Sequence, residues 1–155
     1  MKSALLATLL TLTAAAAHAQ PLWLEAESFS SPGGWVLDTQ FIDVMGSPYL
    51  MAHGMGKPVK DATTTIDLPA GTYTLWARTK NWVAPFNATG TPGRFEISIN
   101  GQKLDHEFGT TGKDWQWEKS APVKITGKTT TLALHDLTGF DGRIDALILA
   151  KDGED

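Results

Sequence analysis

The sequence predicts an all-β protein built as a β-sandwich. Its apolar residues recur mainly with a period of two, which is the pattern of half-buried strands. The clearest run is 72–78, where Tyr73, Leu75 and Ala77 fall on one face. The pair Asn100-Gly101 ends another alternating run, and this dipeptide is the strongest two-residue signal for a hairpin. No segment shows the apolar period of an amphipathic helix.

Further apolar or Thr-rich runs predict the remaining strands in chain order. The predicted strands are residues 22–29, 62–68, 72–78, 94–99, 123–125, 130–134 and 144–149. Turns such as Pro69-Ala70-Gly71 separate them, at a spacing that is typical of a sandwich. Residues 47–58 and 85–93 are rich in glycine, proline or small polar residues, and we expect both to be long loops.

The first 19 residues have the character of a cleavable export signal. Lys2 precedes an apolar run at residues 4–16, and Ala17-His18-Ala19 matches an A-x-A cleavage site. The run is too short to span a membrane comfortably. We therefore expect residues 1–19 to be a signal peptide and residues 20–155 to be one domain that is secreted or periplasmic. The chain has no cysteine, so neither a disulfide nor a cysteine-linked lipid is available.

Composition and charge exclude some partners. The formal net charge is −4, and the sequence contains no basic run or stripe. This argues against nucleic acid and against an anionic membrane surface as partners. Six tryptophans are many for a chain of 155 residues. Exposed tryptophans commonly bind sugar rings, whereas the plain alternative is that they are buried.

Three acidic residues near the two ends of the domain are candidates for a metal site. Glu25 and Glu27 are two apart and would share one face of a strand. Asp145 lies in the last apolar run and would join them if the first and last strands are neighbours. Carboxylate oxygens suit a hard cation such as calcium. The alternative is a pair of solvated acids on an edge strand.

Several motifs in order along the chain resemble the carbohydrate-binding modules of families 6 and 35. These are Glu25-Ala26-Glu27, residues 68–78 (LPAGTYTLWAR), Ile99-Asn100-Gly101, residues 112–117 (GKDWQW) and residues 144–148 (IDALI). The resemblance implies a jelly-roll β-sandwich, galactose-binding-like in the wider sense, with structural calcium at Glu25, Glu27 and Asp145. Residues 41–49 and 137–142 look more like a module appended to large secreted bacterial oxidoreductases and polysaccharide-active enzymes.

The resemblance also implies a sugar site at the loop end of the sandwich. The families use an aromatic residue of the tryptophan-rich motif and a polar residue just before the last strand, which here implies Trp115 and Asp141. Tyr49 and His53 would face them from the loop at 47–58. Trp82, in the loop after residues 72–78, is a further candidate for ligand binding. Whether Trp115 is exposed or packed in the core is left open by the sequence, while Trp117, Trp23 and Trp35 are expected to be buried.

The outer face of a sheet is the other candidate surface. If Tyr73, Leu75 and Ala77 face inward, Trp76 and Arg78 face outward, as does Arg94 on its own strand. An aromatic ring flanked by two arginines could hold an acidic sugar. The alternative is a cation–π pair covered by a loop.

Signals for catalysis are weak throughout the sequence. Gly54-Met55-Gly56-Lys57-Pro58 lacks the spacing of a phosphate loop, and no G-x-S-x-G or paired-histidine motif occurs. The sequence therefore predicts a secreted, non-catalytic module that binds a glycan or polysaccharide and carries structural calcium. One alternative is an accessory domain that contacts a protein, such as an associated secreted enzyme. A small hydrolase is the lesser alternative.

Overall fold

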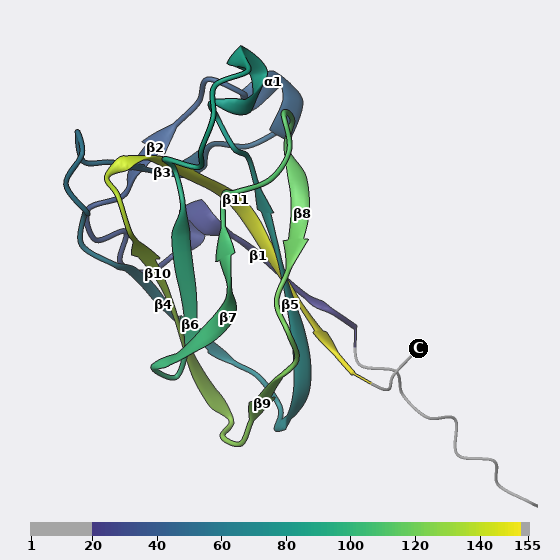
Figure 1. Cartoon of the computed structure of the whole chain (residues 1–155). Helices are drawn as coiled ribbons and strands as arrows, with labels where there is room; N and C mark the ends of the chain where they lie inside the picture. The colour runs from purple at the N-terminus through teal and green to yellow at the C-terminus, as the bar shows by residue number, and fades with distance from the viewer. Residues whose placement is uncertain (1–19, 153–155) are drawn as a thin grey trace, which may run out of the picture.

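Two antiparallel β-sheets pack face to face in this computed structural model, which describes residues 20–152 (Figure 1). The predicted signal peptide lies outside the described residues. The seven-stranded sheet has the order β2-β3-β11-β5-β8, with β1 also paired to β11 and β9 to β5. The four-stranded sheet has the order β4-β10-β6-β7. The predicted all-β sandwich is confirmed.

The strands are short, apart from β5 and β11. The larger sheet contains β1 (Leu22–Glu25), β2 (Val36–Asp38), β3 (Tyr49–His53), β5 (Gly71–Thr79), β8 (Gln116–Lys119), β9 (Val123–Ile125) and β11 (Phe140–Lys151). The smaller sheet contains β4 (Ala62–Asp67), β6 (Phe95–Ile99), β7 (Gln102–Phe108) and β10 (Thr129–Asp136). The helical elements are η1 (Ala26–Ser28), α1 (Ile42–Met45) and η2 (Ala84–Phe86).

The long strand β11 organises the larger sheet. Its first half pairs with β3, and its second half pairs with β1 on the same edge. Its other edge pairs with β5, whose far edge is shared by β8 and β9. The expected neighbourhood of the first and last strands is therefore confirmed. In Figure 1, α1 lies at one end of the sandwich and β9 lies at the other.

The core lies between the sheets and follows the predicted alternation. Tyr73, Leu75 and Ala77 of β5 point inward, and Phe95 and Ile97 of β6 meet them from the other sheet. Burial of these alternate side chains is the main stabilising contribution available to a chain without disulfides. The β6–β7 turn uses Asn100 and Gly101 with positive φ at both residues, as its sequence predicts.

Two local predictions are wrong. Residues 47–58 are not one loop, because Tyr49–His53 forms β3 between β2 and β11 and buries Leu50 and Ala52. The first strand ends at Glu25, because the backbone then turns through η1 and places Glu27 there. Glu25 and Glu27 therefore do not share a strand face, although both remain near β11.

Candidate functional site

A pocket of about 430 Å³ opens at the end of the sandwich that carries α1. We call it the loop-end pocket. Its lining consists of Gln40, Phe41, Lys80, Trp82, Pro85, Phe86, Asp141 and Arg143. These residues come from the segment before α1, the segment after β5 that includes η2, and the start of β11. Three separate parts of the chain meet here because β5 ends and β11 begins at the same end of the sheet.

An aromatic wall forms one side of the loop-end pocket. The Trp82 indole N–H donates a hydrogen bond of 2.9 Å to the carbonyl of Phe140, which fixes the ring. The Arg143 guanidinium lies 5.6 Å from the centre of that ring. The turn of η2, closed by Asn87 with a positive φ, presents Phe86 with 75% of its surface exposed. Together these rings offer an apolar surface to a ligand.

Two buried cations face this wall. Lys80 and Arg143 are only 7% and 8% exposed. The Lys80 ammonium lies 4.7 Å from the centre of the Phe41 ring. Arg143 has two buried nitrogens, Nε and Nη1, that have no hydrogen-bond partner among residues 20–152. Leaving buried N–H donors without an acceptor is costly, so a ligand that accepts hydrogen bonds from these two nitrogens would be favoured.

The single carboxylate among the described lining residues is Asp141. It adopts a positive φ at the start of β11, where the pairing with β3 shifts its register. His53 Nδ1 lies 2.6 Å from Asp141 Oδ1 and orients the carboxylate. The loop before it is held by Asp136, which accepts hydrogen bonds from the backbone N–H groups of Val59, Thr138 and Gly139.

The structure separates the predicted ligand-binding residues into two groups. Trp82 and Asp141 line the loop-end pocket, and His53 joins it through Asp141. Trp115 and Tyr49 do not line it; their rings lie 4.9 Å apart and both contact Phe41. Tyr49 is fully buried, and burial raises the pKa of its hydroxyl to about 12. Trp115 and Tyr49 therefore support Phe41 from behind.

Sequence reasoning missed Lys80, Phe86 and Arg143. A usable signal existed for Arg143, which is two residues after Asp141 and so shares its strand face. Nothing local to Lys80 or Phe86 distinguishes them from ordinary loop residues.

The acid cluster consists of Glu25, Glu27 and Asp145. One oxygen of Glu25 accepts a 2.8 Å hydrogen bond from the Trp23 indole N–H. The other oxygen of Glu25 and one oxygen of Glu27 are buried and lack a hydrogen-bond partner within the described part of the chain. Arg78 Nη1 lies 3.6 Å from Asp145 Oδ2, and the Ser47 hydroxyl donates to Asp145 Oδ1 at 3.4 Å.

The electrostatics of the acid cluster are unfavourable to its negative charges. Burial raises the pKa of Asp145 to about 6; Arg78 lowers this pKa, and Glu25 and Glu27 raise it further. Burial also raises the pKa of Glu27, with a further contribution from Glu25. Within residues 20–152, no three His, Cys, Asp or Glu side chains stand close enough together to hold a metal ion as they lie. The unpartnered oxygens nevertheless fit the chemistry of a hard cation.

A second concave surface lies on the outer face of the larger sheet. It is a groove of about 250 Å³ lined by Trp76, Trp117, Ile148 and Ala150, which we call the tryptophan groove. The predicted outward direction of Trp76 and Arg78 is confirmed. Arg94 is not part of this face, because it lies beside β6 in the smaller sheet and pairs with Glu107 at 3.6 Å.

The predicted burial of Trp23 and Trp117 is wrong, whereas that of Trp35 is confirmed. Trp23 is 51% exposed, and its ring contacts the half-buried Trp117 edge to face at 5.4 Å. The reason lies in β8, where the inward position is taken by Glu118. This carboxylate is buried and accepts hydrogen bonds from Thr79, His106 and the backbone of Gly109, so Trp117 must face outward.

The fold is shared with carbohydrate-binding modules. The structure is similar to a GH26-CBM35 β-(1,4)-mannanase of Podospora anserina (TM-score 0.65, 18% identity, 86% of this chain). It is similar to a family 35 module of Clostridium thermocellum (TM-score 0.64, 18% identity) over 84% of this chain and 98% of that one. A CBM36 domain of a xylanase from the hindgut metagenome of Trinervitermes trinervoides gives a TM-score of 0.63 at 16% identity, over 86% and 99% of the two chains.

The protein has the jelly-roll fold of these modules. The resemblance read from the sequence motifs is thus confirmed for the fold. The chain spans 28% of the length of the Podospora mannanase, so it matches a part of that protein. No protein-family model and no curated protein sequence matches the chain. None of the helices within residues 20–152 has the length and hydropathy to cross a membrane.

Proposed function

We propose that the protein is a non-catalytic module that binds glycans in the loop-end pocket. The observation that carries this proposal is the pairing of an aromatic wall with buried, unpartnered hydrogen-bond donors in one concave site. Such a mixture of apolar surface and a few polar groups is typical of small-molecule sites. The fold that the chain shares with carbohydrate-binding modules supports the proposal.

Each part of the pocket has a role in this proposal. The apolar face of a sugar ring packs against Trp82 and Phe86, and its hydroxyl groups donate to Asp141. Two cations, Lys80 and Arg143, outnumber the single carboxylate of the lining. An acidic sugar therefore fits this site better than a neutral one, because its carboxylate can accept hydrogen bonds from Arg143. A lone carboxylate in the lining also supports a binding role, since glycoside hydrolysis generally uses two.

The test is a binding assay with trisaccharides of galacturonate, mannuronate and glucuronoxylan, set beside neutral xylotriose and mannotriose. We expect the acidic sugars to bind and Arg143→Met to weaken them by about 2 kcal/mol, or roughly thirtyfold. Arg94→Met is the matched control, because Arg94 is half-exposed and lies on the other sheet. The proposal is wrong if no glycan binds, or if both variants weaken binding equally.

We also propose that the acid cluster holds a structural calcium ion. Glu25, Glu27 and Asp145 would supply its oxygens, and the ion would neutralise charges that burial and mutual repulsion now disfavour. When bound, the calcium ion would add a Lewis-acidic positive charge that links Glu25 of β1 to Asp145 of β11. Binding to the folded state alone stabilises it by about 2.7 kcal/mol at a hundredfold excess over Kd.

Thermal melting in calcium and in chelator tests the calcium proposal. We expect chelation to lower the melting temperature of the wild-type protein, and Asp145→Ala to remove the effect of chelation. Asp67→Ala, which changes an exposed acid of β4, should leave that effect in place. If the wild-type protein melts at the same temperature in calcium and in chelator, the calcium proposal is wrong, and Glu25 and Glu27 are simply surface acids.

The same module could also act as an accessory domain of an enzyme. The Podospora mannanase, of which this chain matches 28%, supports it. In that case the catalytic activity would belong to the partner, and the module would contribute binding. The export expected for residues 1–19 would place both in the periplasm or outside the cell.

A further inference from the structure

We propose that His53 is a positioning residue for the loop-end pocket, which holds the Asp141 carboxylate away from Arg143 and so keeps that arginine available to an acidic sugar. The inference rests on the proposed function, because it explains how the pocket retains a free cation for its ligand. His53 does not line the pocket, so its effect reaches the ligand through Asp141.

Opposite charges meet in the loop-end pocket without forming an ion pair. Asp141 and Arg143 are two residues apart at the start of β11, which is about 7 Å along a strand, and both line the pocket. An arginine beside a carboxylate commonly binds it through two parallel hydrogen bonds. Within residues 20–152, however, Arg143 forms no salt bridge, and its Nε and Nη1 have no hydrogen-bond partner. Another contact must therefore hold the carboxylate.

His53 provides that contact. Its Nδ1 lies 2.6 Å from Asp141 Oδ1. An ionised carboxylate only accepts hydrogen bonds, so Nδ1 carries the proton and is the donor. A hydrogen bond to a charged acceptor is roughly twice as strong as one between neutral groups. The carboxylate is thus bound from the side of β3, while Arg143 remains unpaired in the pocket.

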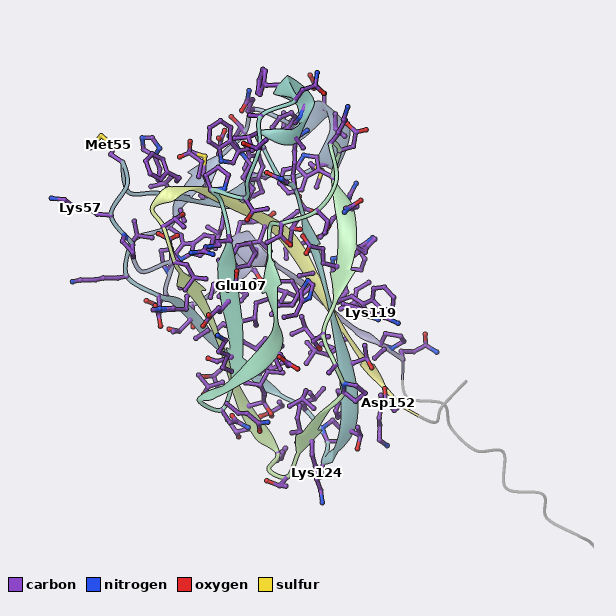
Figure 2. All side chains as sticks on the ribbon, viewed as in Figure 1. Met55, Lys57, Glu107, Lys119, Lys124 and Asp152 are labelled. Atoms are coloured by element: carbon purple, nitrogen blue, oxygen red, sulfur yellow. The ribbon has the colours of Figure 1, made fainter. Side chains whose placement is uncertain are left out.

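The backbone on both sides of this contact is fixed. His53 ends β3 and pairs with Phe140 of β11. The next residue, Gly54, donates its N–H to the carbonyl of Gly139 at 3.0 Å. Figure 2 shows that Lys57, the cation of the segment that follows, points away from the sandwich. The imidazole is therefore presented to β11 by a fixed backbone, without competition from this lysine.

The side chain of Asp141 is the part that can move. Its backbone has a φ of 57°, in the left-handed region that aspartate tolerates. The carbonyl before it, that of Phe140, accepts the indole hydrogen bond of Trp82 at 2.9 Å. Loss of His53 would therefore free the carboxylate alone. Arg143, with two buried and unpartnered nitrogens, would gain from pairing with it, and the pair would occupy donors that an acidic sugar needs.

A second histidine–aspartate pair supplies the matched control. His135 Nδ1 lies 2.8 Å from Asp61 Oδ1, and the side chains of His135 and His53 are both 52% exposed. His135 belongs to β10 in the smaller sheet and does not line the pocket. Replacing either histidine removes one imidazole and one hydrogen bond to a carboxylate. Only the change at His53 should alter the surroundings of Arg143.

A crystal structure of the His53→Leu variant without ligand tests the positioning itself. We expect an Asp141 oxygen to lie within about 4 Å of an Arg143 nitrogen, which is the distance of a salt bridge. In a crystal structure of His135→Leu, Asp141 and Arg143 should lie as they do in the wild-type protein. A His53→Leu structure in which the Asp141 carboxylate stays unpaired overturns the inference, whether or not a glycan binds.

Calorimetry supplies the second readout, with the acidic trisaccharide that the wild-type protein binds most tightly. We expect His53→Leu to weaken binding about tenfold and His135→Leu to change it by no more than about twofold. His53→Asn should stay within about threefold of the wild-type affinity, because its amide N–H can take the place of Nδ1–H. His53→Ala replaces His53→Leu in both experiments if the leucine variant does not fold.

A double-mutant cycle separates positioning from structural support. Asp141→Asn keeps an acceptor and a residue type that tolerates the left-handed backbone, but it carries no charge to pair with Arg143. In that background, His53→Leu should change acidic-trisaccharide binding by no more than about twofold. Equal losses in the two backgrounds would mean that His53 acts on the fold or on the ligand itself, and the inference would be wrong.

The outcomes separate this inference from the proposed function. If acidic trisaccharides bind and Arg143→Met weakens them while His53→Leu does not, only the inference about His53 fails. If the wild-type protein binds neutral trisaccharides alone, glycan binding stands and this inference fails. If it binds none of the trisaccharides, both proposals fail.

Discussion

The loop-end pocket and the tryptophan groove are concave surfaces of one sandwich that are built in opposite ways. The pocket is assembled from three segments outside the regular strands or at their ends, and it contains buried charges. The groove is made by side chains of three neighbouring strands, and its lining is apolar. A site of the first kind depends on hydrogen bonds that hold loops in place. A site of the second kind depends only on sheet register.

This difference assigns the two surfaces different tasks. Buried donors such as those of Arg143 reject a ligand that leaves them unpaired, so under the proposed function the pocket can select one sugar from another. The lining of the groove is apolar, so it offers contact area and little power of selection. The pocket should therefore be lost when its loops are disturbed, while the groove should survive.

The most disruptive test of this comparison is Asp136→Ala. The fully buried carboxylate accepts hydrogen bonds from three backbone N–H groups that position the start of β11. Losing these bonds should cost about 3–9 kcal/mol of folding free energy, at about 1–3 kcal/mol for each of the three unpaired donors. Below the melting temperature, trisaccharide binding should disappear, while the Trp23–Trp117 contact of the groove, read from near-ultraviolet circular dichroism, should persist. Simultaneous loss of both, in a protein that is still folded by circular dichroism, would contradict the independence of the two sites.

The next test uses pH and the acid cluster, which lies near Trp23 and Arg78 on the larger sheet. Burial raises the pKa of Asp145 to about 6 from its usual 3.8. In chelator, the folded state then holds this proton more tightly than the unfolded state does between about pH 4 and pH 6. This carboxyl should therefore reduce stability as pH rises through that window, by at most about 3 kcal/mol.

Asp145→Asn carries no such proton and provides the reference for that test. The free energy of unfolding of wild-type protein, minus that of the variant, should decrease as pH rises from about 4 to 6. Added calcium should abolish this decrease, because a cation favours the ionised form. A difference that stays constant with pH would show that Asp145 is not buried against Glu25 and Glu27.

The smallest effect is expected from Lys119→Gln. The ammonium lies at an exposed rim, where a cation–π contact is worth about 0.5 kcal/mol. The free energy of unfolding should therefore fall by about 0.5 kcal/mol, and trisaccharide binding in the loop-end pocket should not change. A loss of trisaccharide binding would mean that Lys119 acts at a distance on the pocket.

The sandwich could be predicted because strand alternation is a local property. Tyr73, Leu75 and Ala77 identify their own inner face, and Asn100-Gly101 identifies its own turn. Strand β3 was missed because Tyr49 and His53 look like loop residues beside glycine and proline. Its membership in the sheet comes from pairing with β2 and β11, which are far from each other in sequence.

The candidate sites were predicted less well, for a different reason. Glu118 reversed the expected facing of Trp117, because its buried hydrogen bonds depend on His106 and Gly109 of a neighbouring segment. Lys80 and Arg143 meet in the pocket only through the three-dimensional fold. Trp82 could be named because it follows a predicted strand, and Asp141 because of the resemblance to the carbohydrate-binding families.

The antiparallel pairing of β1 with β11 has a mechanical consequence. Leu22, near the start of the described chain, stands opposite Leu149, near its end, and Glu25 stands opposite Ala146. A pulling force applied to the two ends would load this ladder one rung at a time, starting at Leu22. Trp23 would leave the sheet before Glu25 does. Tension on a tethered molecule would therefore detach β1, together with Trp23, from β11 while the rest of the sandwich remained folded.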